Sequence, residues 1–284
     1  MKFKWLYFLI SSLIIVPGFF SLIKWGLRPS IDFRGGSVLE VKFEKEINSS
    51  ELEKVIEEKL VGGQVIRMGK ENRFSLRSSE ISNDEKIAFL QLLKEKFGPV
   101  EEIQFASLGP ALGKELLIKT FVGILIATLG ILIYVSLRFK EKSFGICAIL
   151  AMLHDSLVLL GVFSLLGYFA QIEVDSLFVT AVLTALAFSV HDTVVVYDRI
   201  RELSRLYPKL NFSQLADRAV LQTLSRSINN SMTIIFVLLA LFLLGGETIR
   251  WFSFALLIGA ISGTYSSTFV AVPLLVIWRE KLNL

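Results

Sequence analysis

The sequence predicts an α-helical membrane protein that crosses a bilayer six times and carries one small α+β domain between its first two spans. Three observations predict this class. Hydrophobic residues make up 53% of the chain, and the mean hydropathy is +0.62, whereas soluble domains are typically about 45–50% apolar even with glycine counted. The apolar residues gather into six stretches, each near the roughly 20 residues that a helix needs to cross a bilayer. One long polar stretch separates the first two. An ordinary soluble protein is therefore excluded.

The six expected spans cover residues 5–23, 116–137, 144–169, 177–197, 231–245 and 251–277. Lys2 and Lys4 precede the first span, which is also the charge pattern of a secretory signal peptide. The apolar core of this span is longer than that of a typical signal peptide, and no small-x-small cleavage site follows it. We therefore expect a retained helix, with a first domain boundary at residues 1–25.

Basic residues predict the orientation, because loops rich in Lys and Arg stay in the cytoplasm. If the chain crosses six times, its basic loops all fall on one side: Lys2, Lys4, Arg138, Lys140, Lys142, Arg199, Arg201, Arg205, Lys209, Arg218, Arg226, Arg279 and Lys281. The short opposite loops carry Glu173, Asp175 and Glu247. Both termini and the loop 198–228 are expected to be cytoplasmic, in the cytoplasmic membrane. The net charge of +4 is then explained by these loops rather than by nucleic-acid binding.

The polar stretch 26–113 is expected to form a separate domain on the external side. Alternating residues 37–43 predict a strand, Ser49 and Ser50 precede a helix at 51–60, and 64–68 and 73–77 form a hairpin around the turn 69–72. A second helix at 82–97 and a strand at 100–107 follow. The order β-α-β-β-α-β is that of a ferredoxin-like domain. No cluster of catalytic residue types lies there, so we expect a scaffold or a polypeptide-contacting module. Residues 114–284 then hold the remaining five spans.

Ionisable residues inside the expected spans are the candidate functional residues. A carboxylate at the bilayer centre costs at least about 2.5–3.5 kcal/mol on insertion scales, and it persists only where it has polar partners or serves a proton pathway. Asp155 lies about ten residues into the third span, which places it roughly 15 Å deep. Asp192 lies nearer the cytoplasmic end of the fourth span, at a depth similar to that of Arg226.

We expect Asp192 and Arg226 to form a pair, for which two interpretations remain open. The pair is either a salt bridge that fastens helices together or a proton-responsive switch, because burial and a neighbouring guanidinium shift a carboxyl pKa in opposite directions. The adjacent histidines, His154 and His191, either join a proton relay or act as hydrogen-bonded packing residues.

Small and polar residues repeat at helical spacing on the last three spans, which predicts close packing among them. The fourth span shows Ala181, Ala185, Ser189 and Asp192 on one face, the fifth Arg226, Asn230 and Thr233, and the sixth Gly259, Gly263, Ser267 and Ala271. We expect these faces to enclose Asp192 and Arg226.

Several kinds of chemistry have no signature in the sequence. The phosphate-binding pattern Gly-x-x-x-x-Gly-Lys-[Ser/Thr] is absent, so no ATPase is expected. The single cysteine, Cys147, can form no internal disulfide, and no zinc-ligand spacing exists. We expect no metal, no cofactor and no enzymatic activity, and any work must draw on an ion gradient or on a partner.

Six motifs in order resemble the SecD/SecF protein-export family. The segment Asp32-Phe33-Arg34-Gly35-Gly36 resembles its Gly-x-Asp-Phe-x-Gly-Gly signature, and the segment starting at Gly109-Pro110 is similar to the family's segment before the second span. His154-Asp155 matches the family's third span, and Gly259 and Gly263 match its sixth.

The fourth and fifth spans carry the more specific motifs. His191-Asp192-Thr-Val-Val-Val-Tyr-Asp198-Arg199-Ile-Arg201-Glu resembles Asn-Asp-Thr-Val-Val-x-Phe-Asp-Arg-Ile-Arg-Glu, with His191 in the place of the usual Asn. The segment around Arg226 resembles Thr-Leu-x-Arg-Thr. The single external domain and the short loops indicate the SecF branch of the family.

This resemblance implies half of a twelve-helix unit of the RND-transporter type, completed by SecD. Such a unit assists the SecYEG channel, with YajC and YidC as further partners, and uses the proton-motive force to pull unfolded preprotein outward. By motif, Asp192 is the proton-responsive carboxylate and Arg226 the arginine coupled to it, while Asp155 has no assigned role. Each proton supplies about 2.3 kcal/mol per 100 mV.

Two other functions remain open at this point. One is an RND-like carrier of a lipid or other small molecule, which requires an apolar pocket of substrate size in an external domain of only about 90 residues. The other is a passive assembly subunit in which Asp192 and Arg226 only hold helices together. The coupling ion is either a proton or sodium.

Overall fold

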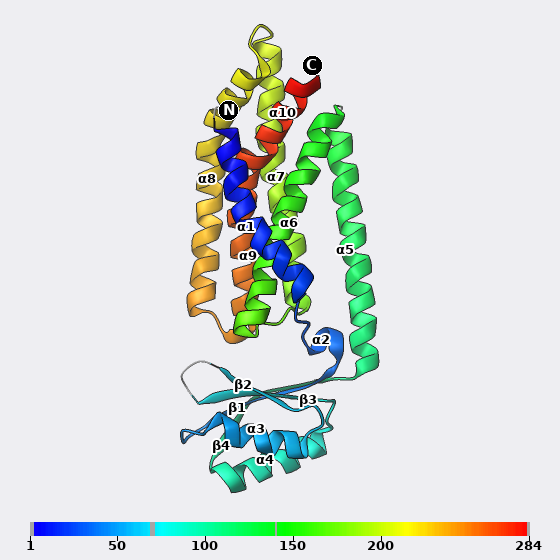
Figure 1. Ribbon diagram of the computed structural model, residues 1–284, viewed down its shortest axis with the longest axis vertical. Helices are drawn as coiled ribbons and strands as arrows, with labels where there is room; N and C mark the ends of the chain where they lie inside the picture. The colour runs from blue at the N-terminus through cyan, green and yellow to red at the C-terminus, as the bar shows by residue number, and fades with distance from the viewer. Residues whose placement is uncertain (1–2, 69–71, 140, 283–284) are drawn as a thin grey trace. The chain divides into compact units, whose positions relative to one another are not determined.

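The computed structural model describes residues 3–68, 72–139 and 141–282 (Figure 1). The turn 69–71 and the basic residues Lys2 and Lys140 of the sequence argument lie outside the described residues. The chain forms two compact units, a membrane unit of Met1–Arg28 with Val122–Leu284 and a smaller unit of Pro29–Phe121.

Within the described residues, six helices are long and apolar enough to span a bilayer, which confirms the predicted number. The first five are α1 (Lys4–Lys24), α5 (Pro110–Arg138), α6 (Lys142–Ala170), α7 (Ser176–Leu206) and α8 (Phe212–Leu244). The sixth consists of α9 (Glu247–Ser266), a π-helical segment η1 (Ser267–Ala271) and α10 (Val272–Leu282). Pro273 follows the π-helical segment, and because proline lacks a backbone N–H it disrupts the regular α-helical ladder at this point.

The helices continue beyond their apolar parts. Within the expected loop 198–228, α7 extends to Leu206 and α8 begins at Phe212, so only residues 207–211 link the two helices. The side chain of Asn211 accepts a hydrogen bond of 2.8 Å from the backbone N–H of Gln214 and thereby caps α8. Hydropathy locates the apolar part of such a helix but not its polar extension.

The smaller unit contains α2 (Ile31–Arg34), β1 (Gly36–Phe43), α3 (Ser49–Lys59), β2 (Gln64–Met68), β3 (Arg73–Ser78), α4 (Asn83–Phe97) and β4 (Val100–Leu108). After α2 the order is β-α-β-β-α-β, as predicted. The strands form one antiparallel sheet in the order β2-β3-β1-β4, with α3 and α4 on one face (Figure 1). The helix α3 is capped by Asn48 rather than by the expected serines, and α4 begins with a capping box between Ser82 and Glu85.

The core of the smaller unit lies between the sheet and its two helices. Alternate residues of β1, namely Leu39, Val41 and Phe43, are buried, as the period of a strand requires. They share one cluster with buried side chains of α3 and α4, including Leu52, Ile56, Phe89 and Leu93.

Glycines bring the helices of the membrane unit into close contact. A Cβ built on Gly259 would lie 2.3 Å from the Cβ of Ala185, and one on Gly263 would lie 3.2 Å from the Cα of Ser189. Between α1 and α6, a Cβ built on Gly18 would lie 2.9 Å from the Cα of Gly161. The predicted ladder of small residues on the sixth span is therefore the contact surface with α7, as membrane helix packing favours.

Candidate functional site

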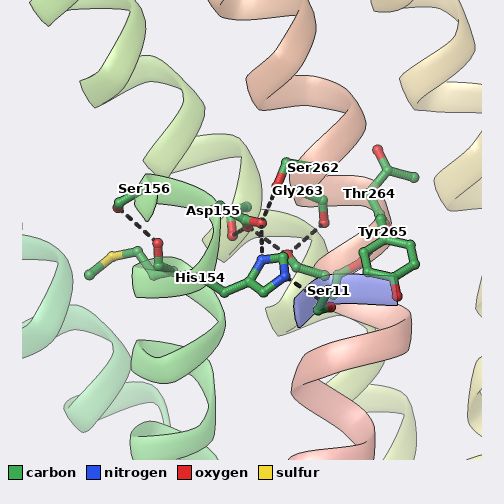
Figure 2. A network of polar contacts seen from close by, with 12 residues as sticks. Ser11, His154, Asp155, Ser156, Ser262, Gly263, Thr264 and Tyr265 are labelled. Atoms are coloured by element: carbon green, nitrogen blue, oxygen red, sulfur yellow. Dashed lines mark hydrogen bonds and ion pairs between the residues drawn. The ribbon is translucent and has the colours of Figure 1, made fainter. Parts of the chain in front are cut away.

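Asp155 on α6 is the centre of a buried polar network in the membrane unit (Figure 2). Its side chain is only 2% exposed. The two carboxylate oxygens accept hydrogen bonds of 2.5 Å from three serine hydroxyls, those of Ser189 on α7 and of Ser262 and Ser266 on α9. The network thus joins three helices, and it satisfies a group that would otherwise be costly to bury.

His154 extends the network to a fourth helix. Its Nδ1 lies 3.0 Å from Asp155, and its Nε2 lies 3.0 Å from the hydroxyl of Ser11 on α1. Because a carboxylate only accepts hydrogen bonds, Nδ1 carries a proton whenever Asp155 is ionised. The histidine ring is buried, so it is a hydrogen-bonded link between α1 and the carboxylate.

Ser189 was predicted to lie on the packed face of the fourth span, but the other serines of this network were not predicted from the sequence. The helices α1 and α6 run parallel, and three of their contacts share one sequence offset: Ser11 with His154, Gly18 with Gly161, and Ser21 with Ser164. The hydroxyls of Ser21 and Ser164 lie 2.7 Å apart. Ser11, Gly18 and Ser21 on the first apolar helix, at the same spacing as His154, Gly161 and Ser164 on α6, are the signal that indicates this contact.

Asp192 lies on the same face of α7 as Ser189, three residues earlier. Its carboxylate accepts a hydrogen bond from the hydroxyl of Ser227 on α8. It also lines a small cavity of about 20 Å³ together with Asn230, Ser231 and Thr264, which is room for about one water molecule. Unlike Asp155, Asp192 is only partly buried, so it combines a hydrogen-bonded position with a cavity that has room for about one water molecule.

The expected ion pair between Asp192 and Arg226 is not formed among the residues that the structure describes. Arg226 is exposed, and Ser227, one residue later, occupies the position beside Asp192. The packed face of α8 is the row Thr223, Ser227 and Ser231, which are buried at intervals of four residues. Arg226 lies about 100° away around the helix, on the exposed side with Asn230 and Thr233. His191 is also exposed.

The polar residues after Asp192 lie near the end of α7. Asp198 forms ion pairs with Arg138 of α5 and, at 3.4 Å, with Arg201. Arg199 pairs with Glu202 and donates a hydrogen bond of 2.7 Å from its Nε to Gln222 of α8. These residues therefore tie α7 to α5 and α8.

The Gly-Gly motif lies where β1 begins in the smaller unit. Gly35 and Gly36 have φ angles of +75° and +114°, a region that favours glycine. A Cβ on Gly35 would lie 2.6 Å from the Cα of Pro110, and a Cβ on Gly36 would lie 2.6 Å from the carbonyl oxygen of Ser78. Asp32 belongs to α2, and its backbone N–H is bonded to the Ser30 hydroxyl at 3.2 Å.

Gly109, which follows β4, is also closely packed, because a Cβ there would lie 3.2 Å from the carboxylate of Glu80. The junction of β1, β4 and α5 thus contains Gly35, Gly36, Gly109 and Pro110. The close approach of the backbone at these positions explains why the motif has glycines there.

Taken together, the fold and the site define a multi-pass membrane protein with two intramembrane carboxylates held by hydroxyl groups. Within the described part of the chain, no group of three or more His, Cys, Asp or Glu side chains is arranged to hold a metal ion. The chemistry that this arrangement offers is exchange of a proton or a cation at a carboxylate.

Comparison with known proteins identifies the family. Residues 88–281 match the family model described as "Protein export membrane protein SecD/SecF, C-terminal", and residues 20–47 match the SecD/SecF GG motif. Proteins named Protein translocase subunit SecF from Thermobaculum terrenum and Anaerolinea thermophila are 44% and 42% identical. These alignments cover 99% and 98% of this chain and 93% and 92% of the relatives. This chain belongs to the SecD/SecF family.

A solved structure gives the same fold. The crystal structure of SecDF, described as a translocon-associated membrane protein from Thermus thermophilus, is similar with a TM-score of 0.88 at 30% identity. The similarity covers 99% of this chain but only 39% of the longer SecDF chain. A second SecDF structure, in a super-membrane-facing form, has a TM-score of 0.69.

Proposed function

We propose that this chain is the SecF subunit of an accessory complex of the Sec translocase, and that it uses the proton-motive force to promote preprotein translocation across the cytoplasmic membrane. Family membership and the names of the full-length relatives support the assignment to the Sec system. The absence of a phosphate-binding motif from the sequence supports an ion gradient as the energy source. On this proposal the chain is not an enzyme.

The single observation that carries the coupling proposal is the difference between the two carboxylates. Asp155 has four hydrogen-bonding partners in a closed core, so its network is suited to hold helices in place. Among the described residues Asp192 has one hydrogen-bonding partner, Ser227, and it lines a cavity large enough for one water. Asp192 is therefore the site of proton exchange, and Ser189 links it along α7 to the Asp155 network.

Arg226 acts in a second state of the same site. Ser227 and Arg226 are consecutive, so a partial rotation of α8 replaces the hydroxyl beside Asp192 with the long guanidinium side chain. An ionised Asp192 favours the arginine and a protonated one the serine, which makes α8 a two-state element biased by the proton. His191, next to Asp192 and exposed, is positioned to deliver or receive the proton.

SecD is the partner that covers the exposed polar side of α7 and α8. His191, Arg226 and Asn230 are exposed in this chain, although they lie within helices that span the bilayer, and lipid is a poor environment for such groups. A protein partner with complementary polar groups satisfies them. The SecYEG channel, with YajC and YidC, is the wider assembly implied by this function.

The smaller unit is the part that faces outward and contacts unfolded preprotein. Its β-α-β-β-α-β order and its strand order β2-β3-β1-β4 support a ferredoxin-like domain. The excess of basic residues in the loops between spans supports an orientation with both termini in the cytoplasm.

The experiment that tests this function is preprotein export into inverted membrane vesicles that contain SecD with or without this chain. ATP starts export, and a proton gradient is imposed afterwards. We expect the gradient to accelerate completion of export only when the chain is present. Equal acceleration without the chain would contradict the proposal.

A further inference from the structure

A cavity of about 280 Å³ lies in the membrane unit, away from the carboxylates. It is lined by Arg201 and Arg205 of α7, Arg279 of α10, Glu141, and the rings of Phe139 and Phe144. It is at the end of the unit where the chain termini meet, because Lys4 of α1 is bonded to Glu280 of α10 at 2.5 Å. This cavity has no part in the proposed proton exchange.

Positive charge exceeds negative charge around this cavity. Arg279 is paired with Glu141, and its guanidinium stacks on Phe144 and Phe212 at 5.6 Å and 4.5 Å from the ring centroids. The Nε of Arg279 is buried without a hydrogen-bond partner. Arg201 shares the carboxylate of Asp198 with Arg138. Four arginines therefore lie here, the three that line the cavity and Arg138 beside Arg201. Two carboxylates, those of Glu141 and Asp198, are divided among Arg138, Arg201 and Arg279, and none is left for the fourth arginine.

Arg205 is that fourth arginine. Among the residues that the structure describes, no side chain or backbone group forms a hydrogen bond or an ion pair with it, and it is exposed at the rim of the cavity. An arginine that lines a cavity without a partner is available to an anion, and its planar group of N–H donors matches phosphate oxygens.

The start of α6 adds to the attraction for an anion. Glu141 occupies the N-cap position, but its side chain makes no capping hydrogen bond, because its carboxylate is bonded to Arg279. The first N–H groups of this 29-residue helix are therefore left without a side-chain cap beside the cavity. The N-terminus of a helix carries partial positive charge and favours phosphate.

The surroundings of the cavity match a membrane lipid. Leu137 of α5 and Ile146 of α6 are 80% and 38% exposed, and they flank Phe139 and Phe144 on helices that span the bilayer. An acyl chain can lie along such side chains while the headgroup occupies the cavity. Basic pockets between membrane helices on the cytoplasmic side are typical sites for anionic headgroups. We propose that this cavity binds the phosphate of an anionic phospholipid of the phosphatidylglycerol type.

The test measures lipid selectivity with the full chain in phosphatidylcholine nanodiscs. Spin-labelled phosphatidylglycerol and spin-labelled phosphatidylcholine are titrated separately, and the immobilised fraction is recorded by electron paramagnetic resonance. We expect phosphatidylglycerol to be preferred, and Arg205→Gln to weaken its association about fivefold, since one arginine near an anionic headgroup is worth about 1 kcal/mol. Arg205→Glu should weaken it further.

Lys209→Gln is the matched control, because Lys209 is exposed in the link that follows α7 and does not line the cavity. It removes the same charge and should leave the lipid preference unchanged. A loss equal to that of Arg205→Gln would overturn the proposal, as would equal binding of the two lipids by the unmodified chain. Inorganic phosphate titrated in place of the lipid should bind much more weakly, because it has no acyl chain to lie along the apolar side chains, whereas inorganic phosphate that binds as tightly as phosphatidylglycerol would overturn the lipid as the ligand. Thermal unfolding of each variant confirms that it is folded.

Discussion

Gly259 of α9 and Ala185 of α7 approach so closely that a Cβ on the glycine would lie 2.3 Å from the Cβ of the alanine. One turn later, Gly263 lies against Ser189 in the same way. This approach allows Ser189 on one helix and Ser262 on the other to reach the same carboxylate, that of Asp155. The packing of small residues and the polar network are therefore parts of one structure.

The first prediction concerns this contact. Gly259→Ala should lower the free energy of unfolding by about 1–3 kcal/mol, because the added methyl group overlaps Ala185 and the helices must separate. Unfolding in mixed detergent micelles measures the change. Gly145→Ala is the matched control, since a Cβ at Gly145 of α6 would meet no atom within 4 Å. The control should be neutral or stabilising, and an equal loss in both variants would contradict the account.

The second prediction concerns Asp155. Asp155→Ala should destabilise the membrane unit by about 3 kcal/mol or more, because three serine hydroxyls and His154 lose their common partner in a buried site. Ser156→Ala provides the comparison at the next position. The hydroxyl of Ser156 bonds only to the carbonyl of Met152 in its own helix, so its loss should cost less than about 1 kcal/mol. Unfolding measurements on both variants decide whether the network stabilises the helices.

The third prediction concerns the Gly-Gly motif. Gly36→Ala should be more damaging than Gly98→Ala, although both glycines have positive φ angles, +114° and +89°. A Cβ at Gly36 would lie 2.6 Å from the carbonyl oxygen of Ser78, whereas a Cβ at Gly98 would meet nothing within 4 Å. Gly98→Ala should cost only the backbone strain of about 1–2 kcal/mol. Limited proteolysis of the folded protein measures how fast the smaller unit is cleaved in each variant, and we expect faster cleavage in Gly36→Ala. Faster cleavage in Gly98→Ala would exclude a close-packing role for the motif.

The fourth prediction is a pH dependence in the smaller unit. Hydrogen bonds from the backbone N–H and the hydroxyl of Ser82 lower the pKa of Glu85 below its ordinary value of 4.5. Because the pKa is lower in the folded state, this carboxylate contributes stability above pH 4.5, and the contribution is lost as the pH falls through the lowered pKa.

Glu85→Ala should therefore lower the melting temperature at pH 7 and have a smaller effect in acid. Glu95→Ala is the control, since Glu95 is exposed on the same helix and has no hydrogen bond or ion pair in the described part of the chain. Thermal unfolding of the wild type and both variants across acidic pH measures the effect. A Glu85→Ala effect that does not change with pH would count against the capping role.

The membrane spans and the succession of helices and strands along the smaller unit were predictable because their signals are local. Hydropathy marks an apolar helix, and alternation with turn residues marks strands such as 37–43. The glycines of the sixth span were also identified correctly as a packing face, since Gly259 and Gly263 repeat at helical spacing.

The partners of the carboxylates were not predictable in the same way. Which face of α8 packs inward depends on tertiary contacts, and a shift of one residue exchanges Arg226 for Ser227 beside Asp192. The packed face of α8 is marked in the sequence by Thr223, Ser227 and Ser231 at intervals of four residues. The prediction instead chose the face of Arg226, because an intramembrane charge was expected to have a buried partner. The serines around Asp155 come from α7 and α9 while the carboxylate comes from α6, so no local pattern joins them to Asp155.

The central claim is that Asp192 couples a proton gradient to export. The most direct measurement is gradient-dependent completion of preprotein export in inverted vesicles that contain SecD and either the wild-type chain or Asp192→Asn, with assembly of the complex checked in parallel. Ser156→Ala serves as the control. The account predicts that Asp192→Asn assembles normally and loses the gradient-dependent component, while ATP-driven initiation is unchanged. Full gradient dependence in the Asp192→Asn complex would contradict the account, and loss of assembly would reduce Asp192 to a structural role.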